Sequence, residues 1–148
     1  MISVPRRILA PVDFTPGSEA AIEYALFLAR SLGARVTLFH VHDRGGALSA
    51  IVPGADAEAD LQVADQRSLQ RLDLLRHALG PDGSGIDRAV AAGDPAEQIL
   101  GHAAGFDLIV MGTHGRMGVE RILVGSVAET VLRRATIPVL IVHLPESP

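Results

Sequence analysis

One stretch of this chain, residues 107–126, constrains the fold more than any other. It begins with a run of four apolar residues, Leu108–Met111, which is too short for a helix of its own and is typical of a strand buried on both faces of a sheet. The glycines of the following turn, and the residues that open the next segment, are Gly112, Gly115, Gly118, Gly125 and Ser126. A strand, a glycine-rich turn and a helix N-terminus in succession present free backbone N–H groups to an anion. The stretch therefore predicts a phosphate site, which we interpret as one for a nucleotide.

The rest of the chain alternates short apolar runs with amphipathic segments. The expected strands are 8–12, 36–41, 86–91, 108–111 and 137–142. The expected helices are 16–32, 61–79, 95–103 and 127–135, and residues 43–57 are expected to form a loop. Alternation of this kind predicts an α/β fold, with an open parallel sheet covered by helices on both faces. We expect one domain over 1–148.

Short polar signals mark the expected helix ends. Thr15 followed by proline is typical of a helix start, and Gly33 of a helix end. Asp94 and Glu97 have the spacing of a capping box, as do Ser126 and Glu129. The side chains expected to form the buried stripe of the first helix are Ala21, Tyr24, Ala25, Leu28 and Leu32.

Composition excludes several classes of function. The formal net charge is −4 and aromatic residues make up 3% of the chain, so neither a nucleic acid nor an anionic membrane is an expected partner. Cysteine is absent, which rules out disulfides and thiol chemistry. No apolar run approaches the roughly 18 residues of a membrane span, and the first residues lack the pattern of a signal peptide. We therefore expect a cytoplasmic protein.

In open parallel sheets, ligands bind beyond the carboxyl ends of the strands. The residues at those ends are Val12-Asp13, Val41-His42, Ala92-Gly93 and Met111-Gly112. Asp13 is open to three interpretations from the residues alone: it binds a ribose or base, it binds a metal, or it caps the turn that follows.

The glycine-rich segment also has a plainer interpretation, since Gly112 and Gly115 can be simple turn residues. Its length favours a binding role, because 13 residues separate Gly112 from Ser126 where a tight connection takes about 2–6. Ser126 can likewise act as a helix cap, as a phosphate ligand, or as both.

Familiar catalytic parts are missing from the sequence. No lysine lies near the glycine-rich segment, and no serine has the setting of a covalent nucleophile. His40 and His42 face the same side of a strand without a visible third ligand, so zinc is not expected. His114 could meet a phosphate when protonated, and Arg116 and Arg121 are the nearby cations.

These residues together resemble the universal stress proteins of the UspA type over nearly the whole chain. The segments that carry the resemblance are 8–15, 108–116, 125–133 and 137–142. The ATP-binding members of that family share the pattern G-x₂-G-x₉-G-[ST], and Gly112, Gly115, Gly125 and Ser126 match it at every spacing. The resemblance implies a doubly wound sheet of five parallel strands in the order 3-2-1-4-5, similar to the adenine nucleotide alpha hydrolases.

The resemblance also implies a ligand site. Asp13 and the backbone at Val41 would contact adenine and ribose, and the glycine-rich segment would hold the phosphates of ATP, with Mg²⁺ or Mn²⁺ bound through those phosphates. The residues that we expect to line the site are Pro11, Val12, Asp13, Val41, Met111, Gly112, His114, Gly115, Arg116, Gly125, Ser126 and Val127. Met117 and Glu120 depart from the usual small or polar residues of the segment. A homodimer through the final strand, 138–142, is also implied, and an apolar terminal strand is itself an edge that needs covering.

The sequence thus predicts a regulatory, stress-response domain that holds ATP without efficient catalysis. One alternative is a slow ATPase or a nucleotidyl transferase on the same scaffold, with His114 or Glu120 near the γ-phosphate. Another is a dimerisation module that binds no nucleotide. We expect no catalytic residue and no metal ligand from the protein.

Overall fold

A computed structural model describes residues 2–44, 54, 56–80, 85–113 and 125–144. Its five strands form one parallel sheet in the order β3-β2-β1-β4-β5, which confirms the expected fold class and strand order. The strands are β1 (Arg7–Pro11), β2 (Arg35–His42), β3 (Asp87–Ala92), β4 (Leu108–Gly112) and β5 (Val139–Val142). The order reverses between β1 and β4, so these neighbouring strands are about a hundred residues apart in the chain, with β2 and β3 between them in sequence.

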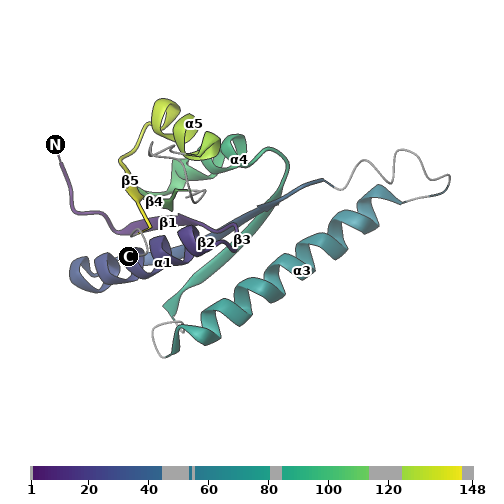
Figure 1. Cartoon of the computed structure of the whole chain (residues 1–148), viewed down its shortest axis with the longest axis horizontal. Coiled ribbons are helices and arrows are strands. Elements are labelled where there is room, and N and C mark those ends of the chain that lie inside the picture. The colour runs from purple at the N-terminus through teal and green to yellow at the C-terminus, as the bar shows by residue number, and fades with distance from the viewer. Residues whose placement is uncertain (1, 45–53, 55, 81–84, 114–124, 145–148) are drawn as a thin grey trace.

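Helices cover both faces of the sheet, as Figure 1 shows. They are α1 (Pro16–Leu32), α3 (Ala57–Ala78), α4 (Pro95–His102) and α5 (Ser126–Arg134), with a short 3₁₀ turn, η2 (Ala103–Gly105), after α4. The helices α1 and α3 lie on one face, and α4 and α5 lie on the other. Each face has its own apolar core, and the central strands β1 and β4 contribute to both because they are buried on both sides.

Three helix ends follow the sequence signals. The Thr15 side chain accepts a hydrogen bond from the backbone N–H of Ser18, and α1 ends at Gly33, whose φ of +66° places it in the left-handed region. Asp94 accepts a hydrogen bond of 2.9 Å from the N–H of Glu97. The Glu97 carboxylate forms an ion pair with Arg134 of α5. This pair links the two helices on their face of the sheet.

The buried face of α1 differs from the expected stripe. Tyr24 is 42% exposed, and Leu28 and Leu32 are only half-buried, whereas Ile22 and Leu26 lie in the core. The expected pattern placed Tyr24 inside because its spacing fits a helical stripe. Ile22, Leu26 and Ala29 also follow a helical period, displaced around the helix from the expected stripe, and this is the face that packs against the sheet.

The long helix α3 starts at Ala57, four residues before the expected position, because Asp56 caps its first turn. Its Ser68 and Leu72 are buried. Most of the expected loop 43–57 lies outside the described residues. In the described parts of the chain, no helix has the length and apolarity required to cross a membrane.

Candidate functional site

A cavity of about 170 Å³, called here the first cavity, opens at the carboxyl ends of β1, β2 and β4, where the strand order reverses. The expected site residues that line it are Pro11, Val12, Asp13, Val41, Met111, Gly112 and Val127. Its wall is mainly apolar, and Asp13 is the only titratable residue among the described residues that line it. Residues at the ends of three strands and at the start of α5 thus surround one cavity. This is the position at which open parallel sheets bind their ligands.

Five further residues line the first cavity that the sequence did not point to: Ser18, Phe39, Pro95, Ile99 and Ala128. Phe39 lies two residues before Val41 on β2 and so shares its face of the sheet. The spacing of two residues between Phe39 and Val41 could therefore have predicted that Phe39 also lines the cavity. Pro95, Ile99 and Ala128 depend on how α4 and α5 lie over the sheet, which no local pattern specifies.

The expected phosphate end of the site is only partly described. Gly125 and Ser126 lie at the N-terminus of α5, but neither lines the first cavity. His114, Gly115 and Arg116 lie outside the described residues. The described part of the site is therefore its apolar end and the start of α5.

Asp13 is held at the rim of the first cavity by its own turn. Its Oδ1 accepts hydrogen bonds from the backbone N–H of Thr15 at 3.0 Å and from the Thr15 hydroxyl at 2.5 Å. Phe14, between them, has a φ of +60°, which is unusual for a residue other than glycine. The turn-capping interpretation of Asp13 is thus confirmed, and the same bonds fix the direction of the carboxylate.

A cluster of rings supports this turn from the α3 side of the sheet. The Phe14 ring lies 4.7 Å from that of His40, and the Arg71 guanidinium of α3 lies 3.8 Å from the centroid of Phe14. His40 Nδ1 donates a hydrogen bond of 2.6 Å to the carbonyl of Val12. Burial lowers the pKa of His40 below its ordinary value of 6.5, with smaller contributions from Arg71 and His42. His40 is therefore neutral at neutral pH and acts as a hydrogen-bond donor to the strand end.

His42, two residues along β2, is bonded to different groups. Its Nε2 lies 2.5 Å from Asp65 Oδ1 on α3, and its Nδ1 lies 2.9 Å from the carbonyl of Asp43. Burial opposes protonation, but these two hydrogen bonds and the Asp65 charge together raise the pKa of His42 above 6.5. Each of the two histidines thus has its own protein partners, and among the described residues no three acidic or histidine side chains are grouped to hold a metal.

Gly112 has a structural role that neither sequence interpretation included. A Cβ atom at Gly112 would lie 2.1 Å from the carbonyl oxygen of Gly17, and a Cβ at Gly17 would lie 2.3 Å from the carbonyl oxygen of Thr113. The two glycines therefore let the first turn of α1 touch the end of β4, backbone against backbone. This contact sets one wall of the first cavity, since Gly112 and Ser18 both line it.

Comparison with known proteins decides the family. The sequence profile of the universal stress protein family matches residues 5–143. The chain belongs to the universal stress protein family. The universal stress protein MJ0531 of Methanocaldococcus jannaschii is 32% identical over 144 residues, which cover 96% of this chain and 84% of that protein.

Solved structures agree with this family assignment. The structure of MJ0577, a universal stress protein of the same organism, aligns with a TM-score of 0.78 at 26% identity and covers 98% of this chain and all of the other. A universal stress protein family protein from Arabidopsis thaliana, solved with AMP bound, aligns with a TM-score of 0.66 over 95% of this chain and 93% of its own. At 19% identity, that second likeness establishes a shared fold only.

Ser126 of this universal stress protein is not a helix cap. The N-cap of α5 is Gly125, whose carbonyl accepts a hydrogen bond of 2.9 Å from the N–H of Glu129, and no side chain caps the helix. The expected capping box is therefore wrong, because the helix begins one residue earlier than that pattern requires. The Glu129 carboxylate pairs with Arg133, one turn along α5. Ser126 is exposed at the first position of the helix.

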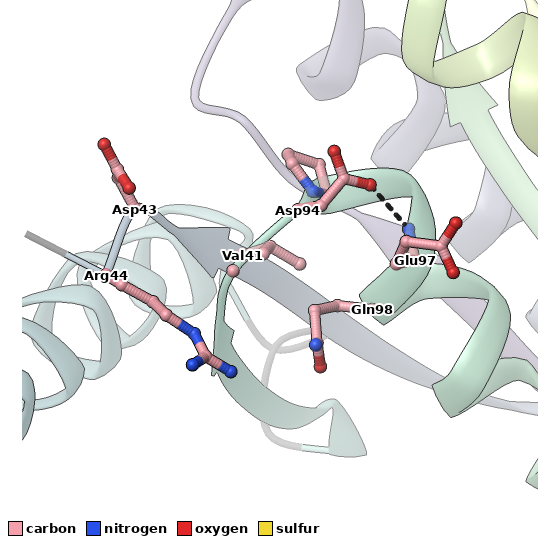
Figure 2. A pocket seen from close by; sticks show the side chains of 8 residues that line it. Val41, Asp43, Arg44, Asp94, Glu97 and Gln98 are labelled. Carbon is pink, nitrogen blue, oxygen red and sulfur yellow. Dashed lines mark hydrogen bonds between the residues drawn. The ribbon is translucent and has the colours of Figure 1, made fainter. Parts of the chain in front are cut away.

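A second cavity of about 650 Å³ lies beside the first, at the carboxyl ends of β2 and β3 and the start of α4. Val41 and Pro95 line both cavities, so the two are neighbours along the edge of the sheet. Figure 2 shows the polar residues around the second cavity, with Val41 between them. The sequence placed Gly93 at the end of a strand, but it did not predict the second cavity.

Proposed function

We propose that this universal stress protein is a cytoplasmic regulatory domain that binds ATP at the first cavity and holds it without efficient hydrolysis. The observation that carries this proposal is the gathering of Asp13, Val41, Gly112 and Val127, from four separate elements, around one cavity at the reversal of strand order. Alternating α/β folds bind nucleotides at this position because helix N-termini and strand ends converge there.

The chemistry of the first cavity supports a base and ribose. Its walls are formed by aliphatic and aromatic side chains such as Phe39, Ile99 and Met111, which suit the faces of a purine. Asp13 at the rim is positioned to accept hydrogen bonds from ribose hydroxyls. At about 170 Å³ the cavity is smaller than the roughly 300–1,000 Å³ of typical ligand pockets. We therefore place the phosphates beyond it, at the N-terminus of α5 and along the glycine-rich segment, which includes His114, Gly115 and Arg116.

The proposed Mg²⁺ or Mn²⁺ binds through the phosphates. Among the described residues that line the first cavity, Asp13 supplies the only carboxylate. Because Asp13 is assigned to the ribose, the metal is proposed to bind through the phosphates and water, which magnesium commonly retains when it is bound with substrate phosphates.

The sequence of the glycine-rich segment supports holding rather than hydrolysis. No lysine lies near it, whereas lysine is the residue that cradles the phosphates in the common nucleotide-hydrolysing loops. The Arabidopsis protein with the same fold was solved with AMP bound, and an adenine nucleotide is carried to this chain as part of the proposal.

We further propose that two copies associate through β5. In the described sheet, β5 has a neighbour on one side only, β4. The carbonyls of Pro138 and Val142 accept hydrogen bonds from Ile109 and Thr113, so alternation along the strand directs the N–H groups of Val139 and Ile141 to the open edge. An apolar strand with an open edge is stabilised when a second copy adds its own strand there.

The direct test is mass spectrometry of any ligand released from the purified protein, followed by calorimetric titration of ATP with and without Mg²⁺. We expect an adenine nucleotide, or measurable ATP binding, in the wild-type protein. Gly115→Val should abolish binding, because a side chain there blocks close approach of the phosphates. Gly85→Val is the matched control, since nothing lies within 4 Å of a Cβ at that position. The proposal fails if the wild-type protein binds no ATP at millimolar concentration.

A further inference from the structure

The turn that carries Asp13 has a strained backbone. Phe14, the next residue, has a φ of +60°, a conformation in which the Cβ atom of a side chain crowds its own backbone. Thr15 donates to the Asp13 carboxylate from its backbone N–H and from its hydroxyl. Because Phe14 lies between these two partners, its backbone conformation fixes the geometry of both bonds. The direction of the Asp13 carboxylate therefore depends on how firmly Phe14 is held.

Two side chains contact the half-buried Phe14 ring. The Arg71 guanidinium lies 3.8 Å from the ring centroid, and the His40 ring lies 4.7 Å away, tilted by 58°. A cation over an aromatic face is attracted to it, and more strongly where water is partly excluded. Burial and, to a smaller extent, the Arg71 charge lower the pKa of His40, so the neutral imidazole does not repel Arg71. The Phe14 ring is thus held in one position by contacts with α3 and β2.

Arg71 reaches this ring from a firmly anchored part of α3. Its neighbours on that helix, Ser68 and Leu72, are buried, and Leu72 belongs to the core on the α1 side of the sheet. Figure 1 shows α3 along that side of the sheet. Arg71 itself is exposed, so its long side chain spans from the surface of α3 to the turn between β1 and α1. The helix thereby supports a turn that lies more than fifty residues earlier in the chain.

We propose that Arg71 is a positioning residue for the nucleotide: it holds Phe14 in its left-handed conformation, and through it the Asp13 carboxylate in the direction that binds the ribose. The inference rests on the proposed function, in which Asp13 accepts hydrogen bonds from the ribose hydroxyls. Arg71 does not touch the ligand in this role. It stabilises the turn before the ligand arrives, so that less ordering is left to the binding step.

The test compares ATP with 2′,3′-dideoxy-ATP, which lacks both ribose hydroxyls, by calorimetric titration. We expect the wild-type protein to prefer ATP by roughly ten-fold, the effect of losing a hydrogen bond to a charged acceptor. Arg71→Leu should lose most of this preference. Arg71→Lys should retain most of it, because an ammonium group is also attracted to an aromatic face.

The matched control is Arg67→Leu, at an exposed arginine one turn earlier on α3, which should keep the wild-type ratio of the two affinities. Both ligands carry the same phosphates, so the loss of a distant positive charge affects both and cancels in the ratio. The ratio is also measured within each variant, so a general loss of stability does not imitate the expected change.

A double-mutant cycle with Phe14→Gly tests whether Arg71 acts through the turn. Glycine adopts a positive φ without strain, so the turn of Phe14→Gly does not need the cation. Arg71→Leu should change the ATP-to-dideoxy-ATP ratio in the wild-type background and leave it unchanged in the Phe14→Gly background. A stack that only stabilises the fold would lower the free energy of unfolding without changing this ratio in either background, and that result would overturn the proposal.

The affinities of the wild-type protein separate the possible failures. If it prefers ATP and Arg71→Leu retains the full preference, the positioning role of Arg71 is wrong while the proposed function stands. If it binds both ligands equally well, the contact of Asp13 with the ribose is wrong and the role of Arg71 with it. If it binds neither ligand, the proposed function is wrong as well.

Discussion

Two glycines from distant parts of the chain hold one wall of the first cavity. Gly17 lies in the first turn of α1 and Gly112 ends β4. A side chain at Gly112 would overlap the carbonyl of Gly17, and one at Gly17 would overlap the carbonyl of Thr113. In the sequence, Gly112 stood out for its spacing to Gly115 and Gly125. The structure shows that Gly112 also has a purely steric role. A glycine at this position is therefore not, by itself, evidence of a ligand-binding site.

This contact predicts the effect of adding one methyl group. Gly112→Ala should destabilise the protein by about 1–3 kcal/mol, because the new Cβ would overlap the carbonyl of Gly17, 2.1 Å away, and backbone cannot move aside cheaply. Urea unfolding measures the change. Gly101→Ala in α4 is the control, since nothing lies within 4 Å of its Cβ and alanine favours a helix, so it should be neutral or stabilising. Equal stability of the two variants would contradict the contact.

The bond between His42 and Asp65 predicts a pH-dependent contribution to stability. The pKa of His42 in the folded protein is raised above 6.5, so the pair's stabilisation is fully present below pH 6.5 and is lost as pH rises through the raised value. Compared with Asp65→Asn, the wild-type protein should be more stable by up to about 1 kcal/mol near pH 6, because Asp65 is 45% exposed and solvent screens the pair.

The measurement is the free energy of unfolding of both proteins between pH 5.5 and 9. The lowered pKa of His40 acts in the opposite direction, destabilising the fold as pH falls, but it is present in both proteins and cancels in the difference. Asp43, beside His42, is also common to both. Asp87→Asn is the control, since Asp87 pairs with Arg35, which does not titrate in this range. A pH-independent difference for Asp65→Asn would refute the role of His42.

Among the elements, the helix ends show what local sequence can predict. The caps at Thr15, Gly33 and Asp94 were predictable because each is a side chain or a glycine acting within its own turn. The same pattern failed at Ser126, where the helix begins one residue earlier, at Gly125. The buried face of α1 was predicted only in part, because two overlapping apolar stripes fit its sequence and the one with Ile22 and Leu26 is buried in place of the one with Tyr24 and Leu28.

The corrected start of α5 separates binding from stability at Ser126. Ser126→Ala should leave the free energy of unfolding nearly unchanged, because no cap is lost, while it weakens ATP binding if Ser126 contacts a phosphate. Asp94→Ala, which removes a true cap, should cost about 1 kcal/mol. Thermal unfolding and ATP titration of both variants measure the two effects. A loss of stability in Ser126→Ala as large as that in Asp94→Ala would restore the capping interpretation.

For the whole molecule, the location of the first cavity was predictable from the alternation of strands and helices, and the strand order from the family resemblance. The second cavity was not predicted. Alternating strands and helices define which strand ends face the ligand, and this rule found Asp13, Val41 and Gly112. The second cavity depends on side chains of Arg44 and Gln98 that converge over Gly93. That convergence arises only when α4 lies across the ends of β2 and β3.

The proposed dimer has a sharp test at β5. Ile141→Pro removes an N–H that points to the open edge, so it should break the dimer while leaving the hydrogen bonds from β5 to β4 in place. Ile141→Ala is the control, since it shortens the same side chain but keeps the N–H. Sedimentation equilibrium should show monomers for Ile141→Pro and dimers for Ile141→Ala and the wild-type protein. A dimeric Ile141→Pro, or a monomeric wild-type protein, would contradict pairing through this edge.

The most direct measurement of nucleotide binding at the first cavity is a titration with Mg²⁺-ATP followed by amide chemical shifts of the ¹⁵N-labelled protein. Binding at this cavity predicts saturable shifts that are largest at Asp13, Val41, Gly112 and Val127, the residues that surround it on four different elements. It predicts small shifts on the outer face of α3. Saturable shifts centred elsewhere, or none at millimolar ATP, would contradict it.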